Sequence, residues 1–181
     1  MKRWIYALPV VGFAVLAFFL FRSLWSGAPD VLPSALIDKP APAIGPIAMD
    51  TMKPGFDRAD LAAGHVTVIN FFASWCVPCR MESAQLMALS KIPGITIYGV
   101  DYEERQAGAG RTFLNELGDP FSRIVTDPHG ATGINWGVYG VPETYVVDGK
   151  GVVRFKLVGG LTADAMTQQL LPEIEKAKQA S

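Results

Sequence analysis

Two cysteines, Cys76 and Cys79, are the only ones in the 181-residue chain, and Val77 and Pro78 separate them. They follow the apolar, β-branched and aromatic run of residues 66–72, which is typical of a buried strand, and they open the next helical segment. The first turn of a helix offers unpaired N–H groups and the positive end of the helix dipole, which favour thiolate over thiol. We therefore expect Cys76 to be the nucleophile. Cys79, one turn further on, is expected to be the resolving thiol that attacks a mixed disulfide.

Two other interpretations of the cysteine pair are weaker. A closed zinc site needs four ligands, and the only histidines, His65 and His129, occur in unrelated turn-like contexts. A purely structural disulfide across two intervening residues would constrain the unfolded chain little. The pair therefore predicts a redox-active disulfide and no metal site.

The composition limits the other functions that the chain could have. Half of the residues are apolar, which suffices for one well-packed domain with an appendage and is too little for two ordinary domains. The net charge is −1, from 16 basic and 17 acidic residues. Beyond the N-terminus no run of Lys or Arg would follow a phosphate backbone, so nucleic-acid binding is not expected.

The N-terminus has the pattern of a membrane anchor. Lys2 and Arg3 precede eighteen uncharged residues, 4–21, and this length is close to the roughly 20 residues that cross a bilayer. A cleaved secretory signal is the alternative, but its apolar core is usually only about 7 to 15 residues long. The candidate cleavage site at residues 26–28 is also followed by Pro29. We expect an uncleaved single-pass anchor with a cytoplasmic N-terminus and an exported domain.

The sequence therefore predicts four parts. They are a cytoplasmic N-terminus at 1–3, a transmembrane anchor at 4–25, a proline-rich linker at 26–43 and a folded domain at 44–181. For the proline-rich stretch the alternative is a segment that follows a strand edge on the surface of the domain, and the two descriptions can hold in different parts.

The folded domain alternates strands and helices. Beyond the first strand and the Cys-x-x-Cys helix, further strands are expected at 95–100, 121–126, 143–147 and 152–158. Helical segments are expected at 80–91 and 105–117 and after Thr162 as N-cap, and residues 131–138 are expected to form a short helical or irregular insert. This order predicts an α/β domain with a mixed sheet flanked by helices.

Several short motifs resemble one known family. Residues 75–79, Trp-Cys-Val-Pro-Cys, at a strand-to-helix junction and Val141-Pro142 before a hairpin resemble thioredoxin-fold proteins. The run Gly-Val-Tyr-Gly-Val-Pro-Glu-Thr at 137–144 and Cys-Arg-x-Glu at 79–82 narrow the resemblance to the CcmG/DsbE family of cytochrome c maturation. The resemblance covers nearly the whole chain.

This resemblance implies both a fold and an activity. The fold would be thioredoxin-like, with an N-terminal extension, an insert before the cis-proline segment and a cis Pro142 facing the cysteines. The protein would be a periplasmic thiol:disulfide oxidoreductase tethered to the inner membrane. It would reduce apocytochrome c cysteines or a dithiol maturation partner, and a transmembrane electron donor of the DsbD/CcdA type would reduce it in turn.

The resemblance also suggests roles for residues around the cysteines. Asn70 occupies the position where cytoplasmic thioredoxins have a buried aspartate, so the proton acceptor for Cys79 must come from elsewhere. Glu143 is the first candidate, and Glu82 is a second group that could tune the pKa. Trp75 and Pro142 are expected to contact the substrate. Val141 is expected to pair with an extended substrate by its backbone.

Two alternatives to this function remain at the level of sequence. One is a general periplasmic thiol-disulfide reductase of the same fold, acting outside cytochrome maturation. The other is a chaperone that carries copper or haem on the two thiolates, although no histidine or methionine ligand adjoins the cysteine pair.

Overall fold

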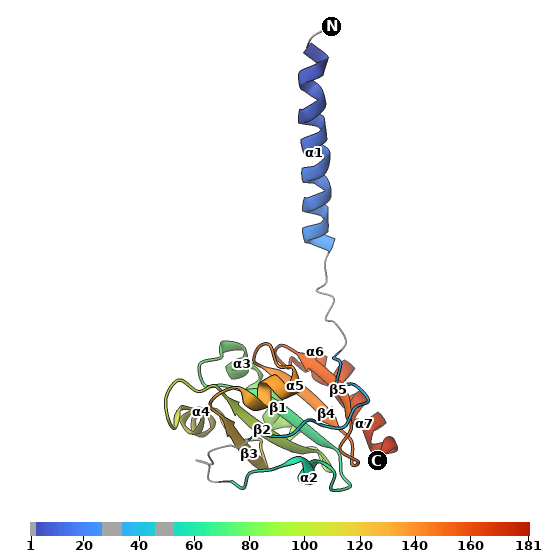
Figure 1. The fold of residues 1–181 in the computed structure, drawn as a ribbon. Coiled ribbons are helices and arrows are strands. Elements are labelled where there is room, and N and C mark those ends of the chain that lie inside the picture. Colours follow the sequence, from blue (N-terminus) through green and yellow to red (C-terminus); the bar gives the residue numbers. More distant parts are fainter. Residues whose placement is uncertain (1–2, 27–33, 46–52) are drawn as a thin grey trace. The chain divides into compact units, whose positions relative to one another are not determined.

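The computed structural model describes residues 3–26, 34–45 and 53–181 (Figure 1). The chain divides into two compact units, Met1–Leu32 and Pro33–Ser181. The first unit contains helix α1, Arg3–Ser26, which has Pro9 in its interior. Within the described ranges, no helix is found to be both long enough and apolar enough to cross a membrane. The anchor expected at 4–25 stays a prediction, and part of the expected linker, 27–33, lies outside the described residues.

The second unit is an α/β domain built on one sheet of five strands. Its strands are β1 Thr67–Phe72, β2 Thr96–Tyr102, β3 Arg123–Asp127, β4 Glu143–Val147 and β5 Val153–Val158. Its helices are α2 Arg58–Leu61, α3 Val77–Leu89, α4 Ala109–Leu117, α5 Ala131–Trp136, α6 Ala163–Ala165, the π-helical turn η1 Met166–Leu170 and α7 Leu171–Ala180. The strand order is β3-β2-β1-β4-β5.

The sheet is mixed, as the sequence predicts. β1 pairs in parallel with β2, and β2 with β3, whereas β4 runs antiparallel to both β1 and β5. All six residues of β1 are buried, because this strand lies in the middle of the sheet with helices on both faces (Figure 1). The cysteine pair begins directly beyond the carboxyl end of this central strand.

Two separate cores lie on the two faces of the sheet. Successive side chains of a strand point to opposite faces, so alternate residues of one strand enter different cores. One core joins alternate residues of the sheet with α3, α4 and α7, and it includes Val68, Phe72, Cys79, Phe113 and Ile174. The other lies under α2 and α5 and includes Ile69, Phe71, Trp136, Tyr145 and Val147. Any site residue on a strand is therefore assigned to one face by its register.

Part of the proline-rich stretch belongs to the folded domain. Pro40 forms an isolated antiparallel bridge with Val152, and the Ala41 N–H donates to the Gly151 carbonyl across 2.7 Å. Ala41 is 1% exposed and contributes to the core beneath α2 and α5. Residues 38–41 thus follow the edge of the sheet, which is the alternative expected for part of this stretch, because β5 offers them backbone groups that would otherwise be unpaired.

Two helix starts differ from the sequence prediction for local reasons, and a third agrees with it. Helix α3 begins at Val77 because Cys76 acts as its N-cap. Helix α4 begins only at Ala109, because Gly108 adopts a left-handed conformation with φ 78° that does not continue a helix. Thr162 caps the terminal helical segment as expected, accepting from the Ala165 N–H across 3.0 Å.

Candidate active site

Cys76 and Cys79 form a disulfide at the N-terminus of α3. The Cys79 N–H donates to Cys76 Sγ across 3.1 Å, so the cap of the helix is the sulfur itself. An N–H group that bonds a sulfur at a helix N-terminus stabilises a thiolate there after reduction. Cys76 is 3% exposed and Cys79 1% exposed, while Val77 beside them is 66% exposed. The pair is thus shielded, but it lies at the surface of the domain.

The loop before β4 faces the cysteines. The peptide bond between Val141 and Pro142 is cis, as the resemblance implied. The Val141 carbonyl oxygen lies 3.4 Å from Cys76 Sγ, within reach of an S–H donor in the dithiol form. Residues 65 positions apart in the sequence therefore meet at the Cys76 sulfur, as the resemblance implied for the cis-proline loop.

Glu82 lies beneath Cys79 on the buried side of α3. It is 1% exposed, and it lines a cavity of about 10 Å³ together with Cys79 and Asn70. Its Oε1 accepts from the side-chain amide of Asn70 across 3.0 Å, and its Oε2 accepts from the Leu161 N–H across 2.6 Å. Asn70 also donates to Thr144 Oγ1 across 3.1 Å. The asparagine of the central strand therefore holds a carboxyl group of the helix next to the resolving cysteine.

The burial of Glu82 changes its acidity. Removal from water raises the pKa of its carboxyl group to about 7, and the hydrogen bonds from Leu161 and Asn70 offset part of this rise. A carboxyl group with a pKa near neutrality can both accept and return a proton under physiological conditions. Glu82 therefore has the acidity and the location of an acid-base group for Cys79.

Glu143 lies on the other face of the sheet. It is 0% exposed, and its Oε2 forms an ion pair of 2.9 Å with Lys156 and accepts from the Tyr145 hydroxyl across 2.8 Å. Its neighbour Thr144 points to the opposite face, where it contacts Asn70. The structure thus brings Glu82 to Cys79. Glu143, the first sequence candidate for the proton acceptor, lies apart from both.

Trp75 lies beside Cys76 and is 38% exposed. Its indole N–H donates to the Glu103 carbonyl oxygen across 3.1 Å, and the Arg105 guanidinium lies 5.0 Å from its ring centroid. The preceding residue, Ser74, is bound by the carboxylate of Glu104. The sequence analysis missed this segment, 103–105. One signal was available. Residues 103–105 follow β2, which is parallel to β1, so they must lie at the same edge of the sheet as the cysteine pair.

A disulfide at a helix N-terminus, a cis-proline loop facing it and a central mixed sheet define a thiol-disulfide oxidoreductase of thioredoxin-like fold. Residues 41–156 match the model of the AhpC/TSA family. The chain is 40% identical over 172 residues to the thiol:disulfide interchange protein DsbE of Pseudomonas aeruginosa, covering 95% of this chain and 93% of the relative. By these two findings the chain belongs to the AhpC/TSA family and, within it, to the DsbE thiol:disulfide interchange proteins.

Two further matches agree with this assignment. The thiol:disulfide interchange protein HelX of Rhodobacter capsulatus is 42% identical over 144 residues, which cover 80% of each chain. The crystal structure of a thiol:disulfide interchange protein DsbE from Chlorobium tepidum superimposes with a TM-score of 0.58 at 30% identity, covering 75% of this chain and 95% of that one. The structural match therefore extends over nearly the whole of the solved relative.

Proposed function

We propose that this oxidoreductase acts as a reductant in cytochrome c maturation, supplying electrons to the paired cysteines of apocytochrome c or to a dithiol maturation partner. Membership of the DsbE family supports the pathway. The observation that carries the chemistry is the bond from the Cys79 N–H to Cys76 Sγ, because it stabilises the thiolate that must attack.

The proposed reaction is a two-step exchange. The Cys76 thiolate attacks one sulfur of the substrate disulfide, which forms a mixed disulfide and releases the other substrate sulfur as a thiolate. Cys79 then loses its proton and attacks Cys76 Sγ. This closes the Cys76–Cys79 disulfide and frees the second substrate thiol. The substrate gains two electrons, and the protein loses them.

Glu82 is the group that we assign to the proton of Cys79. The two residues line the same cavity, whose volume of about 10 Å³ is at the lower limit for holding one water molecule. A proton can therefore pass from the thiol to the carboxylate directly or through a single water. Glu143 has a different assignment, because its ion pair with Lys156 fixes the strand that follows the cis-proline loop.

Substrate contacts are assigned to the surface around Cys76. Trp75 and Val77 are exposed beside the sulfur, and the Val141 carbonyl lies 3.4 Å from it, whereas Pro142 is buried. A disulfide-containing segment bound in extended form would lie between these two groups, with Val141 available for backbone pairing.

The proposal includes an inner-membrane anchor and a periplasmic location for the domain. The support is the uncharged run at 4–21 behind Lys2 and Arg3, which resembles a signal-anchor with a cytoplasmic N-terminus. A dithiol in an oxidising compartment needs continuous reduction, so a transmembrane electron donor of the DsbD/CcdA type completes the proposal.

The reduction potential of the full-length protein tests the direction of transfer. Equilibration with glutathione or dithiothreitol buffers should give a potential toward the reducing end of the roughly −270 to −120 mV range of thioredoxin-like proteins. A potential at the oxidising end would make the protein a disulfide donor and would overturn the proposal.

The substrate is tested separately by a peptide with an oxidised Cys-x-x-Cys-His haem-attachment motif, compared with a scrambled peptide that has the same disulfide loop. We expect faster reduction of the haem-site peptide. A deletion strain should lose c-type cytochromes. Normal cytochromes c together with oxidation of other periplasmic thiol proteins would instead indicate a general reductase.

A further inference from the structure

The segment before the nucleophile is held by a carboxylate that lies outside the Cys-x-x-Cys motif. Ser74 donates two hydrogen bonds to the Glu104 side chain. Its N–H donates to Oε1 across 2.5 Å, and its hydroxyl donates to Oε2 across 2.6 Å. Ser74 lies inside the turn in which the Cys76 N–H donates to the Ala73 carbonyl across 3.2 Å. Glu104 therefore fixes the middle of the turn that delivers Cys76 to the N-terminus of α3.

Glu103 and Arg105, on either side of Glu104, hold Trp75, which is the next residue of the same turn. The Glu103 carbonyl accepts the Trp75 indole N–H, and the Arg105 guanidinium lies over the indole ring. Glu103 adopts a φ of 44°, in the left-handed region that costs energy for a residue with a side chain. Three consecutive residues after β2 thus hold two consecutive residues before Cys76.

A second carboxyl group supports Glu104 from the end of β2. Burial, the charge of Glu104 and a hydrogen bond with its side chain raise the pKa of the Asp101 carboxyl group, and two carboxyl groups can bond each other only when one of them keeps a proton. Asp101 Oδ1 is buried and has no hydrogen-bond partner in the described part of the chain. The Asp101 carboxyl group packs so closely on the backbone of α4 at Gly110 that a β-carbon there would collide with it. Asp101 therefore has little room to move toward α4.

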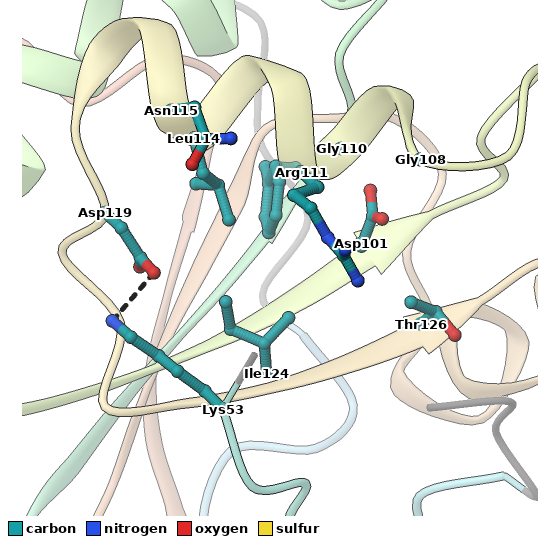
Figure 2. A pocket seen from close by; sticks show the side chains of 11 residues that line it. Lys53, Asp101, Gly108, Gly110, Arg111, Leu114, Asn115, Asp119, Ile124 and Thr126 are labelled. Atoms are coloured by element: carbon teal, nitrogen blue, oxygen red, sulfur yellow. Dashed lines mark ion pairs between the residues drawn. The ribbon is translucent and has the colours of Figure 1, made fainter. Parts of the chain in front are cut away.

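The charged surroundings of this pair come from several elements. Asp101 lines a cavity of about 60 Å³ with Arg111 of α4 and with Lys53 and Asp119, which form an ion pair of 2.7 Å with each other (Figure 2). Figure 2 shows Asp101 at the end of β2 beneath α4, close to Arg111. Glu103 and Arg105 flank Glu104 along the chain, and Asp127 of β3 pairs in register with Tyr102.

We propose that Glu104, together with a proton shared with Asp101, is a positioning residue for Cys76 in thiol-disulfide exchange. While the proton is present, the pair has one negative charge, and Glu104 keeps both bonds to Ser74. When the proton leaves, two adjacent carboxylates repel each other, and the hold on Ser74 weakens. This inference depends on the exchange activity alone and not on the cytochrome substrate.

The first test measures exchange. Full-length protein in detergent, fully reduced, is reacted at pH 7 with dithiobis(nitrobenzoate), and the initial rate reports Cys76. Glu104→Gln replaces one acceptor oxygen by an NH₂ group, and we expect the rate to fall about tenfold, as for the loss of one charge-assisted hydrogen bond. Glu116→Gln is the matched control, because within the described part of the chain Glu116 forms its ion pair with the exposed Arg80, and the rate should stay within twofold of wild type. An unchanged rate in Glu104→Gln would overturn the proposal.

The second test separates positioning from general stability. In the oxidised protein no thiol titrates, so the amide resonance of Ser74 in an NMR pH series reports its bond to Glu104. Burial of Asp101, with Glu104 beside it, raises the pKa of the Asp101 carboxyl to about 8, so the wild-type resonance should move with a midpoint near that pH.

Asp101→Asn supplies a permanent donor to Glu104, and it should therefore abolish this step. Glu82→Gln should retain the step, which excludes the other carboxyl group of raised pKa as its source. A step that persists in Asp101→Asn, or a Ser74 resonance that does not move in the wild type, would overturn the proposal. Because Asp101→Asn keeps the shape of the side chain, this test holds even if Glu104→Gln fails to fold.

Discussion

The side-chain amide of Asn70 in the central strand donates to Glu82 Oε1 in α3 across 3.0 Å, beside Cys79. The same amide group donates to Thr144 of β4, so one asparagine joins two strands and the active-site helix. The side-chain oxygen of Asn70, Oδ1, is buried without a hydrogen-bond partner in the described part of the chain. This arrangement places a carboxyl group with a raised pKa beside Cys79, the thiol to which we assign the resolving role.

The two cysteines should differ in the defect that their removal causes. Cys76→Ser removes the nucleophile, and it should reduce the exchange rate to the uncatalysed background. Cys79→Ser should still attack and should then accumulate mixed disulfides, because the resolving thiol is missing. Non-reducing gel electrophoresis after incubation with an oxidised peptide distinguishes them. Rapid turnover by Cys76→Ser would contradict the assignment of roles.

Glu82→Gln should slow the resolving step more than the attacking step. The amide cannot take the Cys79 proton, so release of the mixed disulfide should slow by about 100-fold, the lower end of general acid-base effects. The pH profile of this release should lose its step near pH 7. Stopped-flow measurement from pH 5.5 to 8.5 checks both effects, with Gln85→Glu on the same helix as a control that adds a carboxylate at a half-buried position. A retained step would rule out Glu82 as the acceptor.

Glu82 should also make the stability of the oxidised protein depend on pH. Its pKa is raised from 4.5 to about 7, so between these values the folded state binds more protons than the unfolded state. Unfolding free energy must then fall as pH rises from about 4.5 to 7 and level off above this, by at most about 3 kcal/mol from this group. Urea unfolding at pH 5 and pH 8 should show a smaller difference in Glu82→Gln than in wild type.

Glu143 should matter for stability and not for the proton of Cys79. Glu143→Ala leaves the Lys156 ammonium without its carboxylate at a site where the lysine side chain is 7% exposed. Breaking such a buried pair should cost about 3 kcal/mol of unfolding free energy. The pH step of mixed-disulfide release should stay near pH 7. Replacing Lys156 and Glu143 together by Met and Leu should restore most of the stability, whereas a shifted pH step in Glu143→Ala would return Glu143 to the proton pathway.

Asn70→Asp should act on Glu82 through charge. The new carboxyl group would lie within hydrogen-bond distance of Glu82, where two carboxylates cannot both ionise readily. We therefore expect the pH step of the resolving reaction to move above 7 and the folded state to lose stability at pH 8. Asn70→Ser, which adds no charge, is the matched control. An unchanged pH profile in Asn70→Asp would show that the two side chains do not interact in solution.

Much of the chemistry and of the fold follows from local sequence. The strand before Cys76, the helix after it and the hairpin at β4 and β5 are determined by apolar runs and by turn residues that act over a few positions. The spacing of Cys76 and Cys79 at a helix N-terminus already specifies a nucleophile and a resolving thiol. The Val141-Pro142 loop was identified through a motif, because no local rule connects it to the cysteines.

The tertiary structure decided which acidic groups serve the site. The sequence made Glu143 the first candidate and Glu82 the second, but a strand sends adjacent side chains to opposite faces, and the register of β4 turns Glu143 away from Cys79. Helix α3 turns Glu82 toward it. Glu104 is thirty residues from Ser74 and contacts it only because β1 and β2 are parallel neighbours that end at the same edge. The sequence by itself determined the two sulfurs, and sheet register, which depends on long-range pairing, determined which acidic groups lie beside them.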